Sequence, residues 1–150
     1  MSIVSDLAKR VGQLPQVAEQ ILINTLEEQS AFIEDKITEQ MSQGKRGDNS
    51  DILPSYDPDY ARLKAQLGLQ SAFVDLRFTG DFYQGIQSQV QKTAKALNIE
   101  GTDEKTPFLL KKYDVREQLL RLSEENLTEL QQDFIIPDQQ EGLVEFLTIR

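Results

Sequence analysis

Hydrophobic residues recur at every third or fourth position over the first third of the chain and predict one long amphipathic helix. The stripe follows Pro15, a residue that suits the first turn of a helix, and stops before Gly44. Its main positions are Ala18, Leu22, Leu26, Ile33, Ile37 and Met41. We therefore expect a helix over residues 16–43, about 40 Å long at about 1.5 Å per residue, after a weakly ordered segment over residues 1–14.

The predicted helix is longer than the core of a 150-residue chain requires. Part of its apolar stripe is therefore a candidate for contact with another subunit, and Ile33, Ile37 and Met41 are the candidate interface residues. The alternative is that the stripe covers a sheet of the same chain, as it does in most amphipathic helices. The pattern alone leaves both interpretations open.

A polar segment that contains glycine and proline follows over residues 44–54 and predicts a mobile loop. Asp48, Ser50 and Asp51 bring oxygen atoms together, but their spacing does not match that of a calcium-binding loop. We expect no metal here. Asp48 and Asp51 are instead candidates for the surface of the loop that meets another subunit.

Asp57 and Pro58 form a clear helix start, with aspartate as the N-cap and proline at the first helical position. Tyr60 begins the apolar side of this short helix, and Gly68 predicts its end. Asp57, Pro58 and Tyr60 are therefore expected to determine the local fold.

An alternating stretch and a hairpin follow. Val74, Leu76 and Phe78 alternate with charged residues, which predicts a short strand. Thr79 and Gly80 interrupt it and are expected to act as a structural pivot. Beyond the pivot, the pattern predicts a helical turn, a strand to about residue 92 and a returning antiparallel strand over residues 93–101.

The last third of the chain predicts short helices and a tail. One helix is expected over residues 104–113, and Ser123 caps another that Pro137 should close. Residues 137–150 read as a strand or a helical tail that docks on a partner, with the candidate interface residues Val144, Phe146 and Ile149. The whole chain is then one α+β domain: a long N-terminal helix packed on a small antiparallel sheet, with short additional helices and a core over residues 55–136.

Composition narrows the possible functions. The chain has no cysteine and no histidine, so thiolate metal sites, disulfides and the commonest general base are absent. A net charge of −9 argues against nucleic-acid binding. No nucleotide-binding or nucleophile motif is present, and no apolar run approaches the roughly 20 residues of a membrane span. We expect a non-enzymatic intracellular protein with no cofactor, no metal, no signal peptide and no membrane partner.

Three segments resemble a known family. They are Pro58, Tyr60, Ala61 and Lys64; then Leu76, Phe78, Thr79, Gly80, Phe82 and Ile86; and finally Leu120-Arg-Leu-Ser-Glu-Glu-Asn126. In order and spacing they resemble tailed-phage virion-morphogenesis proteins of the Mu-type tail-completion, or head–tail joining, class. A Tyr-Ala-x-x-His-Gln-Phe-Gly stretch of that family is absent, and residues 105–113 stand in its place. The Thr79-Gly80-Asp81-Phe82 stretch also resembles small virion proteins of Bacteroidetes-infecting phages.

The resemblance implies a structural protein of the phage tail or neck that forms an oligomeric ring. Its expected partners are further copies of itself and other phage neck or tail proteins, and its expected location is the virion, after assembly in the cytoplasm of the bacterial host. The alternative is an acidic assembly chaperone, or an intracellular binding or regulatory protein, that does not enter the particle.

Overall fold

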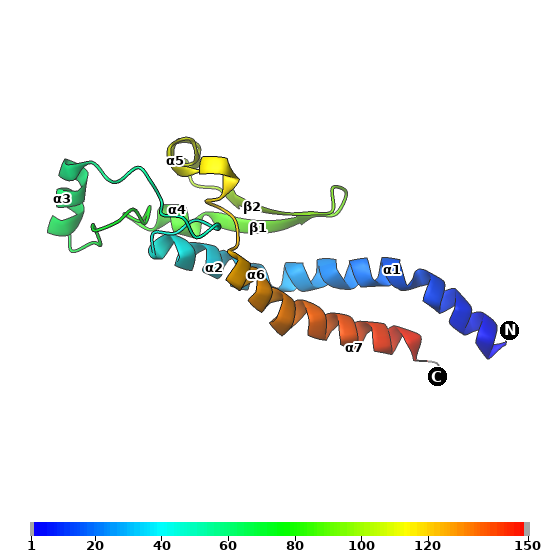
Figure 1. The fold of residues 1–150 in the computed structure, drawn as a ribbon. Helices are drawn as coiled ribbons and strands as arrows, with labels where there is room; N and C mark the ends of the chain where they lie inside the picture. Colours follow the sequence, from blue (N-terminus) through cyan, green and yellow to red (C-terminus); the bar gives the residue numbers. More distant parts are fainter. Residues whose placement is uncertain (1, 149–150) are drawn as a thin grey trace.

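The computed structural model describes residues 2–148 and begins with a 26-residue helix, α1 (Ile3–Glu28). Ser2 caps this helix, because its hydroxyl oxygen accepts a hydrogen bond of 3.1 Å from the Ser5 N–H. Residues 3–14, which the sequence predicted to be weakly ordered, are therefore helical. Pro15 lies inside α1 instead of starting it, and the helix bends in its first half (Figure 1).

The predicted helix over residues 16–43 is divided in two. α1 ends at Gln29, whose backbone angles (φ −97°, ψ 20°) depart from those of a helix, and α2 (Ser30–Ser42) follows directly. α2 packs against the first strand of the hairpin and buries Ile33, Ile37 and Met41 with no exposed surface. The long helical region does cover the small sheet, as the α+β prediction states.

These three residues were the main candidates for a subunit interface, and the structure corrects that assignment. Ile33, Ile37 and Met41 belong to the hydrophobic core of the chain itself. The difference arises because other parts of the same chain, among them Phe82, Ile86 and Leu130, share one core cluster with them. The unpartnered surface of the helical region lies elsewhere, in the first turns of α1.

The segment over residues 44–54 is anchored to the core and is not the mobile loop that its composition predicts. Arg46 is 5% exposed and donates hydrogen bonds to the backbone carbonyls of Tyr113 (3.0 Å), Asp51 and Leu53 (2.9 Å). Its guanidinium supplies several donors from one rigid group. The Gly47 and Ile52 N–H groups also donate hydrogen bonds to the carbonyls of Gln118 and Gly44, so side-chain and backbone contacts together anchor the segment.

The predicted start and end of the next helix are confirmed. α3 (Pro58–Gln66) begins after Asp57, whose carboxylate accepts a hydrogen bond of 2.9 Å from the Asp59 N–H. Past its end, Gly68 has a φ of +73°, a left-handed conformation that favours glycine.

The strand predicted from Val74, Leu76 and Phe78 does not form. Leu76 has a φ of +58°, and the N–H groups of Asp75 and Leu76 donate to the Tyr56 hydroxyl at 3.2 and 2.8 Å. A side chain thus satisfies the backbone groups that a neighbouring strand would otherwise pair. The hydrophobic alternation indicates burial here, since Val74 and Leu76 are both in the core, but not sheet pairing.

The pivot and the hairpin are confirmed. Gly80 has a φ of +91° and leads into a single helical turn, α4 (Asp81–Gln84). Two antiparallel strands follow, β1 (Ile86–Gln91) and β2 (Ala96–Gly101), in a register that pairs Ile86 with Gly101 and Gln91 with Ala96.

The C-terminal third is helical to the end of the described chain. α5 (Thr106–Tyr113) is followed by a short 3₁₀ turn (Val115–Glu117) and by α6 (Glu124–Leu130), which Ser123 caps as predicted. Pro137 does not close this helix, contrary to the prediction. A π-helical turn (Gln131–Ile135) joins α6 to α7 (Ile136–Leu147), and the Ile136 N–H bonds to the Gln131 carbonyl. This shift in hydrogen bonding accommodates the missing N–H of the proline.

α7 lies antiparallel to α1, and the two helices form a stalk that projects from the rest of the molecule (Figure 1). Thr25 donates to the Asp138 carboxylate at 2.7 Å, and Arg10 donates to the carbonyls of Phe146 (2.9 Å) and Thr148 (3.2 Å). We call residues 30–130 the head. The predicted C-terminal tail is therefore a helix on the same chain, and Ile149 lies outside the described residues. No helix within residues 2–148 combines the length and apolarity that crossing a bilayer requires.

The burial of Ile37 leads to the first prediction. Ile37→Ala should lower the free energy of unfolding by about 2–5 kcal/mol, because it leaves a cavity in a closely packed core. The measurement is urea denaturation followed by circular dichroism. The matched control is Val144→Ala in α7, because Val144 is 67% exposed. This substitution should change the free energy of unfolding by about 0.5 kcal/mol or less. If Ile37→Ala instead changed the oligomeric mass of the protein in solution without lowering its stability, Ile37 would belong to a subunit interface.

Candidate functional site

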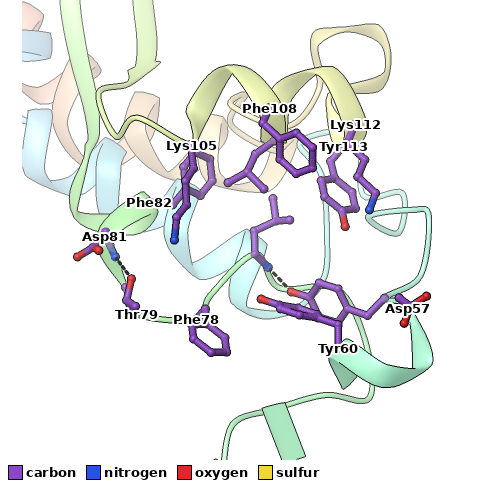
Figure 2. Close-up of a pocket in the computed structure, with 14 residues that line it drawn as sticks. Asp57, Tyr60, Phe78, Thr79, Asp81, Phe82, Lys105, Phe108, Lys112 and Tyr113 are labelled. Carbon is purple, nitrogen blue, oxygen red and sulfur yellow. Dashed lines mark hydrogen bonds between the residues drawn. The ribbon is translucent and has the colours of Figure 1, made fainter. Parts of the chain in front are cut away.

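A pocket of about 380 Å³ opens in the head between α3, α4 and α5 (Figure 2). Its walls are mainly aromatic and apolar, and charged side chains lie among them. The lining consists of Tyr56, Asp57, Tyr60, Leu76, Phe78, Thr79, Gly80, Asp81, Phe82, Lys105, Phe108, Leu109, Lys112 and Tyr113. A volume of this size lies within the range of about 300–1,000 Å³ that is usual for ligand pockets.

One wall comes from α3 and the loops on either side of it. The cap at Asp57 starts α3 so that the Tyr60 ring meets the Tyr56 ring edge to face, with 5.0 Å between centroids. The centroid of the Phe78 ring lies 5.9 Å from that of the Tyr60 ring. The three rings come from segments before, within and after α3 and form one continuous aromatic surface.

A second wall is built by the pivot. The positive φ of Gly80 turns the chain into α4, and the Thr79 hydroxyl oxygen accepts a long hydrogen bond of 3.4 Å from the Asp81 N–H (Figure 2). This turn directs Phe82, which is 5% exposed, into the core beside the pocket.

α5 supplies the third wall with a charged rim. Lys105, Phe108, Leu109 and Lys112 recur at helical spacing and share the face that borders the pocket. Tyr113 is buried at its end, whereas Phe108 remains 66% exposed although it lines the pocket. Within residues 2–148, neither Lys105 nor Lys112 forms an ion pair.

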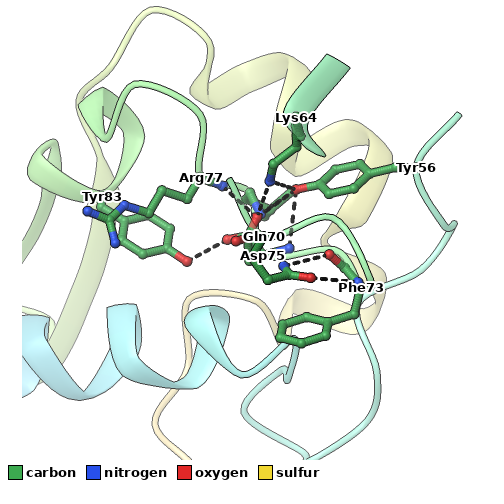
Figure 3. Close-up of polar contacts among 8 residues, drawn as sticks. Tyr56, Lys64, Gln70, Phe73, Asp75, Arg77 and Tyr83 are labelled. Carbon is green, nitrogen blue, oxygen red and sulfur yellow. Dashed lines mark hydrogen bonds and ion pairs between the residues drawn. The ribbon is translucent and has the colours of Figure 1, made fainter. Parts of the chain in front are cut away.

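A buried polar cluster holds the loop behind the pocket (Figure 3). Lys64 has no exposed surface, and its ammonium lies 2.6 Å from the carboxylate of Asp75, whose side chain is 8% exposed. The same carboxylate oxygen accepts hydrogen bonds from the Tyr56 hydroxyl (2.9 Å) and the Arg77 N–H (3.1 Å). The Tyr83 hydroxyl donates to the backbone carbonyl of Asp75. The cluster therefore joins α3, the loop over residues 70–80 and α4.

The environment of this cluster determines its protonation. Burial raises the pKa of the Asp75 carboxyl, but hydrogen bonds from Lys64 and the Arg77 N–H outweigh it, and the net pKa lies below its ordinary value. Burial and the negative charge of Asp75 raise the pKa of Tyr56 and Tyr83, and burial is also the main cause of the raised pKa of Tyr60. These phenols stay protonated near neutral pH, and those of Tyr56 and Tyr83 donate hydrogen bonds to Asp75.

This arrangement is suited to binding. The walls can pack against an apolar or aromatic group, and the two lysines can attract a negative charge beside it. No group of three acidic residues within residues 2–148 is placed to hold a metal ion.

The structure brings several of the predicted residues together at the pocket. Asp57, Tyr60, Thr79 and Gly80 were predicted only to determine the fold, and all four line it, while Pro58 starts the helix that carries Tyr60.

The other predicted residues lie away from the pocket. Asp48 is exposed, accepts a hydrogen bond from the Ser50 N–H, and borders a second, largely polar hollow of about 730 Å³ between α2 and α6. Asp51 pairs with Lys45 at 2.6 Å. Val144 and Phe146 lie on the stalk, where Val144 is exposed and the Phe146 carbonyl accepts a hydrogen bond from Arg10.

Sequence analysis missed the α5 wall and the buried pair. Lys64 lies four residues after Tyr60, a spacing that places both side chains on one side of α3. Together with Asp75 in an apolar stretch, this spacing was the available signal, but charged residues are rarely buried. Leu63 and Leu67 continue the helical spacing from Tyr60 and would be expected on the buried side, but they are 45% and 57% exposed.

Comparisons of the chain with protein-family models, with curated proteins and with solved structures gave no match.

The buried pair leads to the second prediction. Lys64→Met should lower the free energy of unfolding by about 3–5 kcal/mol, because it leaves the Asp75 carboxylate buried without its cation. Lys64→Met/Asp75→Asn should recover part of that loss. Lys92→Met, which removes an exposed ion pair with Glu27, should cost at most about 1 kcal/mol. Urea denaturation measures all three variants, and equal losses for Lys64→Met and Lys92→Met would contradict the assigned role of the pair.

The pKa of Asp75 leads to the third prediction. Because the folded state lowers this pKa, the stability that it contributes is fully present above the unfolded value of about 3.9 and is lost as pH falls through the lower folded value. The stability difference between the wild type and Asp75→Asn should therefore shrink as pH falls from 7 towards 3. Urea midpoints at several pH values test this, and a difference that is independent of pH would contradict it.

Proposed function

We propose that this chain is a non-enzymatic structural protein of tailed phages, a tail-completion or head–tail connector component that forms an oligomeric ring at the neck. Its partners are then further copies of itself and other phage neck or tail proteins, and its location is the virion, reached after assembly in the host cytoplasm. The resemblance of three segments to the tail-completion family motivates this proposal.

The observation that carries the proposal is apolar surface left exposed at the two ends of the molecule. At the free end of the stalk, Ile3 and Val4 are 70% and 77% exposed. At the pocket in the head, Phe108 is 66% exposed. Large exposed apolar side chains that gather at particular places on a protein are typical of surfaces that bind other proteins.

The chemistry of the pocket supports binding in preference to catalysis. The residues that carry the family resemblance in the middle of the chain, among them Tyr60, Phe78, Thr79 and Phe82, gather on its walls. The tyrosines beside them are protonated and the buried carboxylate is neutralised by Lys64. A wall of this kind binds a neighbouring protein and does not activate a substrate.

The charge of the chain suits a position around a DNA channel. A net charge of −9 gives a protein few phosphate-binding cations, and so DNA would pass without being held by counterion-releasing contacts. The same charge also suits the alternative, an acidic assembly chaperone or regulator that leaves before the particle is complete.

Quantitative peptide mass spectrometry of purified particles tests the proposal and supplies the fourth prediction. We expect this chain in mature particles at a low, ring-like copy number relative to the major tail protein. Absence from particles, with the chain present in infected cells, would contradict the structural role and favour the assembly chaperone. The major tail protein in the same sample is the internal control for particle purity.

A further inference from the structure

The pocket between α3, α4 and α5 contains a hydrogen-bond donor that the described chain leaves free. Tyr113 is 3% exposed, and Arg46 donates to its backbone carbonyl, but its hydroxyl has no hydrogen-bond partner within residues 2–148. Figure 2 shows this hydroxyl pointing into the pocket, towards the Tyr60 side. A phenol hydroxyl inside a folded protein usually has a partner, so this one is available to a bound group.

Two lysines lie at the ends of the α5 wall. Lys105 and Lys112 are seven positions apart, which separates them by about 10.5 Å along the helix at about 1.5 Å per residue. Neither forms an ion pair within residues 2–148. The Lys112 ammonium lies 5.3 Å from the centroid of the Tyr113 ring, so a cation and the free phenol occur together at this end of the wall.

The acidic residues of the lining face elsewhere. Asp57 and Asp81 also border the pocket, but Figure 2 shows their carboxylates at its edges, pointing away from its middle. The Asp57 carboxylate caps α3 by accepting the Asp59 N–H at 2.9 Å. The phenol and the two ammonium groups together therefore favour a negatively charged group over a cation.

The occupant must cover more than the interior of the pocket. Phe108 lies between the two lysines in α5 and is 66% exposed although it lines the pocket. A small molecule inside the pocket would leave the outer side of this ring exposed, whereas a polypeptide that crosses the rim would bury it. The lysines then offer a charge contact on either side of Phe108.

We propose that the pocket receives a segment of a neighbouring protein in which one aromatic side chain lies between two carboxylates. The aromatic ring packs against Tyr60 and Phe78, the carboxylates pair with the two lysines, and the carboxylate at Lys112 also accepts a hydrogen bond from the Tyr113 hydroxyl. Alternate residues of an extended segment share one side. Carboxylates two positions before and two positions after the ring are then about 13 Å apart at about 3.3 Å per residue, a span that flexible lysine side chains can match.

This inference deepens the proposed function, because it names the chemistry of the neighbouring protein that the pocket binds in the assembly.

Short peptides test this chemistry and supply the fifth prediction. The probe is acetyl-Asp-Ser-Phe-Ser-Asp-amide, titrated into the isotope-labelled protein and followed by NMR, which gives both the dissociation constant and the site. We expect binding with shifts at the backbone amides of Phe108 and Tyr113. Replacing the phenylalanine of the probe by alanine should weaken binding at least about tenfold, because the ring no longer fills the aromatic wall. Replacing both aspartates by lysine should abolish it, because the pocket lysines repel the peptide.

Variants of the protein test the same contacts from the other side. Lys105→Gln/Lys112→Gln should weaken binding of the probe at least about tenfold, and Tyr113→Phe should weaken it about threefold. Lys111→Gln is the matched control, because Lys111 is an exposed lysine of α5 that does not line the pocket, and it should bind like the wild type. Circular dichroism should show that every variant is folded.

Three results would overturn the inference: no binding of the probe by the wild type, equally tight binding of the lysine peptide, or normal binding of the probe by Lys105→Gln/Lys112→Gln. The free acid 3-phenylpropionate distinguishes the source of the ligand. If it bound as tightly as the peptide, the pocket would take a small aromatic acid, and the assignment to a polypeptide would be wrong.

The inference and the proposed function can fail separately. If the chain is found in particles but does not bind the probe, the inference fails and the structural function remains. If the probe binds as expected but particles lack the chain, the binding site remains and the proposed function fails.

Discussion

The ion pair between Lys64 and Asp75 is the contact on which the shape of the head depends. The Lys64 ammonium lies 2.6 Å from the Asp75 carboxylate inside the head. The Tyr56 hydroxyl donates a hydrogen bond to the same carboxylate and accepts hydrogen bonds from the N–H groups of Asp75 and Leu76. A charge can be buried only where its partners satisfy it, so the loop over residues 70–80 has one acceptable position relative to α3. That position creates the aromatic wall of the pocket.

The stalk depends on a different feature: the C-terminal helical region continues past Pro137 instead of ending there. The π-helical turn over Gln131–Ile135 moves the hydrogen bonds by one residue, and Pro137 then occupies a place where its missing N–H is tolerated. α7 can therefore continue from α6 and run back along α1. Gly142 permits the close approach, because a Cβ atom there would lie 2.6 Å from Ile21 Cδ1.

The buried ion pair and the continued C-terminal helix place the exposed apolar surfaces at opposite ends of an elongated molecule (Figure 1). The buried pair shapes an aromatic pocket with two lysines on its rim, and the far end of the stalk carries the exposed aliphatic side chains of Ile3 and Val4.

Short-range features were determined by the sequence itself. The caps at Asp57 and Ser123, the turn at Gly80 and the hairpin all follow from interactions within a few residues, and these predictions are confirmed. The tertiary structure decided the rest. Hydrophobic periodicity shows which side of a helix is buried but not what covers it, so Ile33, Ile37 and Met41 were assigned to an interface although they form the core. Lys64 and Asp75 can be buried because the fold brings these residues, eleven apart in the sequence, into contact. No local sequence pattern predicts that contact.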